Sequence, residues 1–462
     1  MHYASISAIS GLKPLLPPDV SRCRGTAPPC PYDGWLLMFI AILGTRGIPA
    51  RHGGFETCVE ETSTRLAARG HHVRVYCRKE RGEQPATYRG VALAYVPQPD
   101  NKYLHTLGHT FRAARHLARH PLPAPPVSLI LVDNPLSTTS GRGVVHLYNV
   151  GNAILIPLIH RSGYRVAISV DALDWARSKW NRVARAYLQL AERCAVRFAD
   201  CVIVDSKVIA GYYARRYGRE TAYVAYGADT TEVTEDDLVR SYGLEPGRYV
   251  LFVGRLKPEK QVHHLLEAYR GLETDIPLAI VGDDPFSQDY IRQLKAMADE
   301  RVRFLGYAYD RAFRQLCAHA ALYVTPSAVE GTSPALLGAM GAGACVLVNG
   351  IPENLETIGD AGFSYAPNDP ADLRRQLARL LASPELRRQT GQRARERVRA
   401  VYNWERITDQ LEAIYEALQY SGLKHSGLKH SGLKPLLRPG YNDGRRPTDG
   451  EPSAVIRHPS SR

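Results

Sequence analysis

Long hydrophobic runs are missing from this chain of 462 residues. The longest uninterrupted apolar stretch, from Trp35 to Leu43, has nine residues, whereas a membrane-spanning helix needs about 20. The first 37 residues contain prolines and polar residues where a secretory signal needs an apolar run. We therefore expect neither a transmembrane helix nor export by that route, and we expect the chain to be cytoplasmic.

Cysteines at metal-binding or disulfide spacing are also missing. The eight cysteines include no C-x-x-C motif, and none belongs to a Cys/His cluster with the spacing of zinc ligands. In a chain of this length, cysteines scattered in this way are typical of small buried side chains. We predict no disulfide framework and no structural metal.

The composition is that of an ordinary globular protein, with 44% hydrophobic and 23% charged residues, and the length fits two domains. The net charge of +13 is uneven, because residues 38–230 carry +12 and residues 231–420 carry −5. This asymmetry suggests that the first half faces an anionic surface, such as the cytoplasmic membrane leaflet or a lipid diphosphate. A solvated basic face is the alternative interpretation. Nucleic acid is disfavoured, because the basic residues are not interleaved with aromatic ones in a recognisable module.

The two ends of the chain carry the same short repeat. SGLKH occurs twice near the C-terminal end and continues into SGLKPLL at 431–437, and SGLKPLL also occurs at 10–16. Five-residue periods are too short for a solenoid unit, and surroundings rich in Pro, Gly and Ser favour disorder. We expect residues 1–37 to be a non-native or disordered extension and residues 421–462 to be a disordered tail. Our hypothesis is that a repetitive DNA element was translated at both ends, with Met38 as the functional start.

Between these ends, short apolar runs alternate with helical stretches, which predicts parallel sheets covered on both faces. A polar, acidic break near 226–248 separates two such series. We therefore predict an α/β protein with two Rossmann-like, doubly wound domains at 38–230 and 249–400, a linker at 231–248 and a final helix at 401–420. The expected strands are 39–43, 72–77, 91–96, 127–132, 144–148, 165–170, 201–204, 249–253, 277–281, 301–305, 321–324 and 344–348. The expected helices are 55–69, 102–119, 176–199, 206–217, 259–270, 287–298, 310–319 and 334–341, and 120–143 is expected to be a partly irregular insertion.

The first candidate site is the glycine-rich segment GTRGIPARHGGFE at 44–56, between the first expected strand and helix. Its glycines, among them Gly53 and Gly54, permit backbone conformations that other residues avoid and let a ligand approach the main chain. Ligands of open α/β sheets bind at the carboxyl ends of the strands, as here. The segment lacks the G-x-G-x-x-G spacing of a dinucleotide fingerprint, which disfavours NAD. A tight turn without a ligand is the alternative interpretation.

The second candidate site follows the first strand of the second domain. Arg255 and Lys260 bracket a turn that contains Pro258, so both side chains can reach one anion. Arg suits bidentate contact with phosphate and Lys supplies a point charge, which together suit a diphosphate. Two exposed cations without a ligand are the alternative interpretation.

The third candidate site is TPSAVEGTSPALLGAMGAG at 325–343. Ser333 followed by Pro334 is typical of a helix N-cap and its first helical residue. Glu330 lies just before this helix N-terminus, whose free N–H groups favour phosphate, and it can hydrogen-bond the hydroxyls of a sugar or ribose. Alternatively, Glu330 only interacts favourably with the helix dipole.

Together these segments resemble the retaining glycosyltransferase family 4. The third segment is similar to the family's signature loop, and Arg255 and Lys260 stand where the family holds the donor diphosphate. The stretches GIPARHGGFETCVEE, VDALDWARSKWNR and YNVGN resemble the subgroup that includes bacterial polysaccharide rhamnosyltransferases. The resemblance extends over residues 38–420. It implies a GT-B fold, in which two Rossmann-like domains face each other across a cleft and the C-terminal helix packs back on the first domain.

The resemblance also implies roles for individual residues. The nucleotide-sugar would bind mostly to the second domain and the acceptor to the first. The expected catalytic residues are Arg255, Lys260 and Glu330; the expected donor-binding residues are Gly53, Gly54, Arg255, Lys260, Glu330, Gly331, Thr332, Ser333, Pro334 and Gly338; the expected acceptor-side residues are Arg51, His52, Glu56, Asp171 and Asp174. Stabilisation of the leaving diphosphate by Arg255, Lys260 and the helix that begins near Ser333 would dispense with a metal ion, so neither a metal nor a cofactor is expected. Retention would follow from a same-face displacement in which the departing phosphate helps to deprotonate the acceptor.

Two aspartates follow an expected strand in the sequence VDALDW. Many members of the family have a His near the sugar at about this place, and Asp171 is the matching residue here, so we expect it to bind an acceptor or donor hydroxyl. For Asp174, the N-cap of the expected helix 176–199 is an equal alternative. Ala172 stands where similar sequences have Gly.

The main departure from the family is at position 338. The family has a second Glu there that binds the nucleotide ribose, whereas this chain has Gly338. Losing a buried, charge-assisted hydrogen bond costs about 1.5–3 kcal/mol. This departure motivates an alternative hypothesis, a catalytically impaired protein that binds a nucleotide or a glycan and serves as a partner.

The function expected from the sequence is transfer of a hexose or deoxyhexose, such as rhamnose, from a nucleotide-sugar to a lipid-linked or oligosaccharide acceptor in cell-surface polysaccharide synthesis. The basic helices at 104–119 and 176–197 would dock the enzyme to the inner face of the membrane. A nucleotide-sugar epimerase on the same fold is a third alternative, which would react without an acceptor.

Overall fold

The computed structural model describes residues 37–50, 53–79, 82–99, 105–123, 142–176 and 180–420. The described residues from Met38 to Tyr420 belong to one unit. The expectations for the two ends of the chain, for the strand at 127–132 and for most of the insertion at 120–143 lie outside the described residues.

The first sheet is built from strands that the apolar runs predict. Among the described residues it has eight strands in the order β3-β4-β2-β1-β5-β6-β7-β8, and only the pair β3–β4 is antiparallel. Strands β1 and β5 are buried along their whole length, because helices cover both faces. The strands are β1 (Phe39–Leu43), β2 (His72–Arg78), β3 (Thr87–Tyr88), β4 (Val91–Val96), β5 (Val144–Tyr148), β6 (Arg165–Val170), β7 (Cys201–Val204) and β8 (Ala222–Tyr223).

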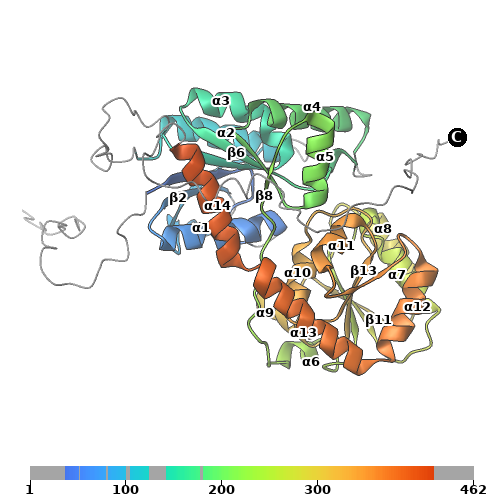
Figure 1. The fold of residues 1–462 in the computed structure, drawn as a ribbon. Helices are drawn as coiled ribbons and strands as arrows, with labels where there is room; N and C mark the ends of the chain where they lie inside the picture. Colours follow the sequence, from blue (N-terminus) through green and yellow to red (C-terminus); the bar gives the residue numbers. More distant parts are fainter. Residues whose placement is uncertain are drawn as a thin grey trace, which may run out of the picture. The chain divides into compact units, whose positions relative to one another are not determined.

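Helices lie on both faces of this sheet (Figure 1). Ile40 and Ile42 of β1 belong to a core that includes residues of α1 and α14, whereas Phe39 and Ala41 belong to a core shared with α2, α3, α4 and α5. Alternate residues of one strand therefore serve opposite cores. The elements are α1 (Gly54–Ala68), α2 (His105–Arg119), η3 (Val150–Leu155), α3 (Ile156–Arg161), η4 (Asp174–Ala176), α4 (Arg182–Phe198), α5 (Lys207–Tyr217) and α14 (Trp404–Gln419).

The second sheet, as far as the structure describes it, has six parallel strands in the order β11-β10-β9-β12-β13-β14. These are β9 (Val250–Val253), β10 (Leu278–Val281), β11 (Val302–Gly306), β12 (Leu322–Thr325), β13 (Val346–Asn349) and β14 (Phe363–Tyr365). The helices are α6 (Asp237–Ser241), η5 (Pro258–Lys260), α7 (Val262–Arg270), α8 (Gln288–Met297), α9 (Asp310–Ala318), α10 (Pro334–Gly341), α11 (Pro352–Ile358), α12 (Pro370–Leu381) and α13 (Pro384–Val401). None of the described helices combines the length and the apolar character that crossing a membrane requires.

The predicted α/β class with two Rossmann-like domains is confirmed, and two helix predictions need correction. The expected helix 176–199 begins only at Arg182, because the Asn181 side chain caps it and accepts a hydrogen bond from Ala184 N at 2.9 Å. The expected helix 259–270 is divided at Gln261, whose φ of 48° separates η5 from α7.

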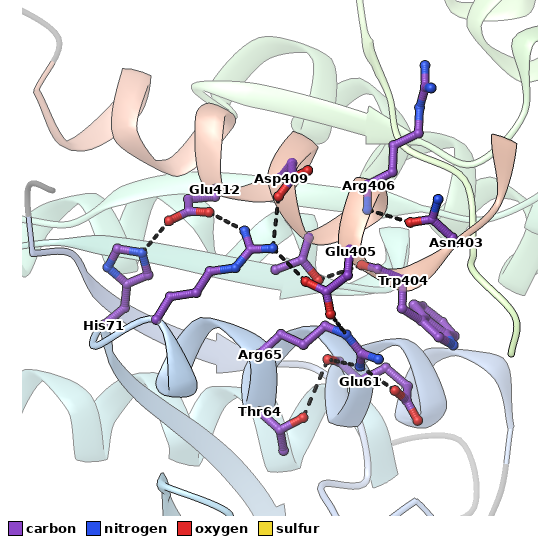
Figure 2. Close-up of polar contacts among 12 residues, drawn as sticks. Glu61, Thr64, Arg65, His71, Asn403, Trp404, Glu405, Arg406, Asp409 and Glu412 are labelled. Atoms are coloured by element: carbon purple, nitrogen blue, oxygen red, sulfur yellow. Dashed lines mark hydrogen bonds and ion pairs between the residues drawn. The ribbon is translucent and has the colours of Figure 1, made fainter. Parts of the chain in front are cut away.

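Charged residues fix α14 to the first domain (Figure 2). Arg69 lies 2.8 Å from the carboxylates of both Glu405 and Asp409. Glu412 pairs with Arg69 through its other oxygen and lies 2.6 Å from His71 Nε2. Burial raises the pKa of Glu412, but the hydrogen bonds with His71 and Arg69 outweigh burial and hold the pKa below its usual value. Helix α14 thus forms part of the first domain although it follows the second sheet in sequence.

Candidate functional site

The glycine-rich loop after β1 is held by its own helix. Glu56 Oε1 accepts a hydrogen bond from Arg46 N at 3.0 Å. Gly47 has a φ of 108°, and a Cβ added there would lie 2.5 Å from Cys77 Sγ. Only glycine fits this position, which fixes the close approach of the loop to β2 at Gly47. Glu56, expected on the acceptor side, therefore has a structural contact with the loop backbone.

The structure brings this loop next to the signature segment of the second domain. A Cβ added at Gly54 would lie 2.6 Å from Cγ of Pro334, the first residue of α10. The predicted helix start is confirmed, since Ser333 is the N-cap and its Oγ accepts a hydrogen bond from Leu336 N at 3.5 Å. Gly53, with a φ of 92°, precedes α1. The expected donor-binding residues of the two domains thus lie side by side.

A largely buried ion pair lies in the second domain. Lys260 Nζ donates a hydrogen bond to Glu330 Oε1, and the two side chains are only 18% and 10% exposed. In the same turn, Lys257 Nζ lies 3.7 Å from Asp284 Oδ2. Arg255 is exposed. The structure therefore pairs Lys260 with Glu330, and it places the third expected catalytic residue, Arg255, just after the end of β9.

This arrangement can hold an anion. The first backbone N–H groups of α10 have no partner within the helix and carry a partial positive charge. Lys260 and Arg255 add full positive charges at the carboxyl end of β9, which is where open α/β sheets bind ligands. Glu330 holds the Lys260 ammonium in place, and a diphosphate can compete for the same ammonium. The group can therefore stabilise negative charge that develops on a leaving phosphate.

Gly338 lies on α10 against an aromatic ring. A Cβ added there would lie 2.7 Å from Cε1 and Cζ of Phe313 on α9, closer than real Cβ contacts occur. A glutamate at position 338 therefore requires the Phe313 ring to move. Phe313 was not among the expected site residues, because its position on an amphipathic helix gives no functional signal.

The structure describes some of the expected acceptor-side residues and not others. Asp171 directly follows β6, and its Oδ1 accepts a hydrogen bond from Ala172 N at 2.8 Å. Asp174 begins η4, and the N-cap role considered for it is wrong, because Asn181 caps α4. Arg51 and His52 lie outside the described residues.

A buried carboxyl group that the sequence analysis missed connects the two domains. Asp205 follows β7, and its Oδ2 accepts a hydrogen bond from Thr332 N at 3.0 Å. The Thr332 hydroxyl donates to the Asp205 carbonyl, and a Cβ added at Gly331 would collide with the Asp205 carboxylate. Burial, together with the negative charge of Asp171, raises the pKa of Asp205 well above its usual value. The expected donor residues Gly331 and Thr332 are thus positioned by the first domain.

A second carboxylate, that of Glu356, connects the second domain to Ser206, the residue after Asp205. Glu356 of α11 accepts hydrogen bonds from Ser206 Oγ at 2.7 Å and from Lys207 N at 2.9 Å. It lies at the N-terminus of α5, where a negative charge is favoured by the helix dipole. The signal that could have found this region is the Asp-Ser pair directly after an apolar strand, which is typical of a helix N-cap.

Metal ligands do not cluster in the part of the chain that the structure describes. No group of three or more His, Cys, Asp or Glu residues there could hold a metal ion. The expectation of a metal-free reaction stays a prediction.

Two segments of the chain match known protein families. Residues 235–397 match the family described as Glycosyl transferases group 1. Residues 148–229 match a domain of unknown function, DUF1972. The first match includes Arg255, Lys260 and Glu330, and the second includes Asp171 and Asp205.

Curated relatives match over part of their length. The chain is 28% identical over 187 residues to O-antigen chain mannosyltransferase B of Escherichia coli, which covers 39% of this chain and 49% of the relative. It is 32% identical over 185 residues to N-acetyl-alpha-D-glucosaminyl L-malate synthase of Bacillus anthracis, which covers 38% of this chain and 48% of the relative. The chain thus spans about half the length of these two relatives.

The fold is similar to that of a solved structure, Anabaena Alr3699/HepE in complex with UDP and glucose. The TM-score is 0.66 at 17% sequence identity, and the match covers 82% of this chain and 100% of the other. This likeness concerns the fold, and it confirms the GT-B class expected from the sequence.

Proposed function

We propose that this protein is a glycosyltransferase that moves a hexose or deoxyhexose, such as rhamnose, from a nucleotide-sugar to a lipid-linked or oligosaccharide acceptor in polysaccharide synthesis, with retention of anomeric configuration. The observation that carries the proposal is the Lys260–Glu330 pair near the N-terminus of α10. This pair lies within the segment that matches Glycosyl transferases group 1. A mannosyltransferase among the relatives and a fold neighbour that binds UDP and glucose support the same class of donor.

In this proposal the donor diphosphate binds at the carboxyl end of β9. Arg255 and Lys260 contact the phosphates, the N-terminal N–H groups of α10 face them, and Glu330 binds hydroxyls of the donor. Negative charge grows on the diphosphate as the bond to the anomeric carbon breaks, so these groups bind the transition state more strongly than the ground state. The departing phosphate accepts the proton of the acceptor hydroxyl on the same face of the sugar, which retains the configuration. No side chain acts as a nucleophile.

The acceptor binds to the first domain in this proposal, with Asp171 on a donor or acceptor hydroxyl. The membrane part of the proposal is supported by α4, where Val183 is 79% and Leu190 is 53% exposed. Arg182 and Arg185 on the same helix are also exposed. Exposed apolar residues flanked by arginines are typical of a helix that lies on an anionic membrane surface. The proposal includes a position at the cytoplasmic face of the membrane.

The alternative of a catalytically impaired partner protein rests on Gly338 alone. The relatives named above, a transferase and a synthase, favour an active enzyme over this alternative.

Calorimetric titration of the full chain with UDP, GDP and dTDP tests the donor half of the proposal. We expect one of these nucleotides to bind with micromolar affinity, and the corresponding nucleotide-sugar to be consumed only when a lipid-linked or oligosaccharide acceptor is present. NMR of the product tests the retained configuration. The transferase proposal is wrong if no nucleotide binds and no donor is consumed, and consumption without an acceptor indicates an epimerase.

A further inference from the structure

A pocket lies between η4, α4 and α5 on the helical layer of the first domain. Its volume is about 270 Å³, close to the lower end of the roughly 300–1,000 Å³ of small-molecule sites. This α4–α5 pocket shares no residue with the glycine-rich loop or with the ion pair of the second domain. Its lining residues are Trp175, Gln189, Arg193, Tyr212, Arg216 and Tyr217.

The aromatic wall of the α4–α5 pocket is fixed before any ligand binds. The Tyr212 hydroxyl donates a hydrogen bond to Glu192 Oε1 at 2.8 Å, and Glu192 is only 2% exposed. The rings of Tyr212 and Tyr217 meet edge to face, with centroids 6.1 Å apart. A wall held in this way loses little conformational entropy when a ligand binds.

A third aromatic residue of the pocket has an unused donor. Trp175 lines the pocket, and its indole Nε1 is buried with no hydrogen-bond partner among the described residues. Buried N–H groups are normally paired, so an unpaired one needs an explanation. The Trp175 ring lines the pocket as an apolar surface, and the Gln189 amide can both donate to and accept from a hydroxyl of a ligand.

Two cations complete the pocket. Arg193 comes from α4 and Arg216 from α5, and the Arg216 guanidinium lies 6.0 Å from the Tyr217 ring centroid. The described lining includes no carboxylate, and the nearby Glu192 carboxylate accepts the hydrogen bond from Tyr212. Guanidinium groups bind phosphate and carboxylate with paired hydrogen bonds.

We propose that the α4–α5 pocket is a binding site for an anionic saccharide, a sugar ring that carries a phosphate or a carboxylate. The sugar ring packs on the tyrosines and Trp175, its hydroxyls pair with Gln189, and its charge lies between Arg193 and Arg216. The site goes beyond the proposed transfer reaction, and it binds its ligand whether or not transfer occurs.

Titration of the full chain tests this site with four probes: glucose 1-phosphate, glucuronate, glucose and inorganic phosphate. We expect at least one of the two charged sugars to change the tryptophan fluorescence and to bind at least tenfold more tightly than glucose and inorganic phosphate. The two charged sugars distinguish a phosphate from a carboxylate ligand. Equal binding of inorganic phosphate and the charged sugars, or no binding of either charged sugar, overturns the proposal.

Variants separate this site from the donor site, which can also bind a sugar phosphate. Arg193→Ala combined with Arg216→Ala should weaken the binding at least tenfold in calorimetry, whereas Arg197→Ala, an exposed arginine of α4 outside the pocket, should leave it unchanged. Trp175→Phe should abolish the fluorescence change. Binding that survives the double variant, in protein shown by circular dichroism to be folded, overturns the proposal. Because none of these variants touches the residues proposed for transfer, this failure is distinguishable from a failure of the proposed function.

Discussion

The two sheets carry loops at corresponding places, after β1 and after β9, and carboxylates stabilise them in different ways. In the first loop, Glu56 and Glu60 accept hydrogen bonds from backbone N–H groups of the loop itself. In the second, Glu330 accepts a hydrogen bond from the ammonium of Lys260, which lies 70 residues away in sequence. A carboxylate bound to backbone sets the shape of a loop, whereas one paired with a side-chain cation can exchange partners with a ligand.

The net charges of the two halves of the chain do not follow the position of the residues that are expected to bind an anion. Residues 38–230 carry a net charge of +12. In their first loop, the carboxylates of Glu56 and Glu60 accept hydrogen bonds from backbone N–H groups. Residues 231–420 carry −5 and contain the Lys260–Glu330 pair. The pair that is expected to bind the donor diphosphate therefore lies in the half of the chain whose net charge is negative.

The largest effect that tests this comparison is expected for Lys260→Ala. Loss of a cation that stabilises the leaving diphosphate should lower kcat/KM for the nucleotide-sugar by about 10²–10³-fold, as for the loss of one oxyanion contact in other enzymes. Lys295→Ala, which removes an exposed lysine of α8, is the matched control and should leave kcat/KM unchanged. A decrease below about threefold for Lys260→Ala would show that the ion pair is only structural.

The next largest effect is expected at the carboxyl group between the domains. Asp205→Ala leaves Thr332 N without its buried acceptor and should lower the free energy of unfolding by about 1–3 kcal/mol. Asp205→Asn keeps an oxygen for that N–H and should cost less. Thermal unfolding followed by circular dichroism measures both, and equal losses would contradict the hydrogen-bond explanation.

The same position gives a pH dependence with a definite sign. The pKa of Asp205 is raised in the folded protein above its ordinary value of 3.8, so folding favours the protonated form. The contribution of Asp205 to stability is complete below pH 3.8 and falls as the pH rises above it. Asp205→Asn cannot titrate, so its stability relative to the wild type should increase from pH 5 to pH 8. Thermal unfolding of the wild type and of Asp205→Asn across this pH range measures the trend.

A mutation at Gly338 should have a similar or smaller effect. Gly338→Glu forces the Phe313 ring to move and should lower the free energy of unfolding by about 1–3 kcal/mol. When Phe313→Ala is present in the same chain, the space is available, and the added carboxylate should strengthen nucleotide binding relative to Phe313→Ala alone. Calorimetry with the preferred nucleotide measures this difference. Weaker or equal binding by the double variant would show that position 338 does not face the nucleotide.

The smallest effect is expected for Glu56→Gln in the first loop. The amide oxygen still accepts a hydrogen bond from Arg46 N, so the free energy of unfolding should change by less than about 1 kcal/mol. Glu330→Gln is its partner in the comparison, and it should lower kcat/KM at least tenfold because Lys260 loses its counter-charge. Similar activity losses for the two variants would remove the distinction between the loops.

The elements that the sequence predicted well are those with strong apolar periodicity. Strand β1 was predicted with its observed ends, because an apolar run stands directly before a glycine-rich loop. Helix α13 was missed because most of its residues are charged or polar, and its buried face consists of Thr390, Gly391, Ala394 and Val398. Strands β3 and β8 have two residues each, which is too short for an alternating pattern.

The candidate site was predicted as separate residues rather than as contacts. Lys260 and Glu330 were each expected from local chemistry, but nothing in the sequence shows that they form a pair. Asp205 was missed because its partner Thr332 lies 127 residues away, and a single Asp after a strand has no distinctive spacing. The packing of Phe313 on Gly338 depends on how α9 and α10 meet, which local patterns do not specify.

The attachment of α14 has a consequence for the order of folding during synthesis. The backbone N–H of Phe39, in the first strand to be made, donates a hydrogen bond at 3.0 Å to Gln419, 380 residues later. At roughly 5–20 residues per second, the ribosome needs about 20–80 s to make that interval. For this time the nascent first domain has an apolar sheet face without its covering helix. The domain that is made first is therefore completed last, because its covering helix is the last described element to leave the ribosome.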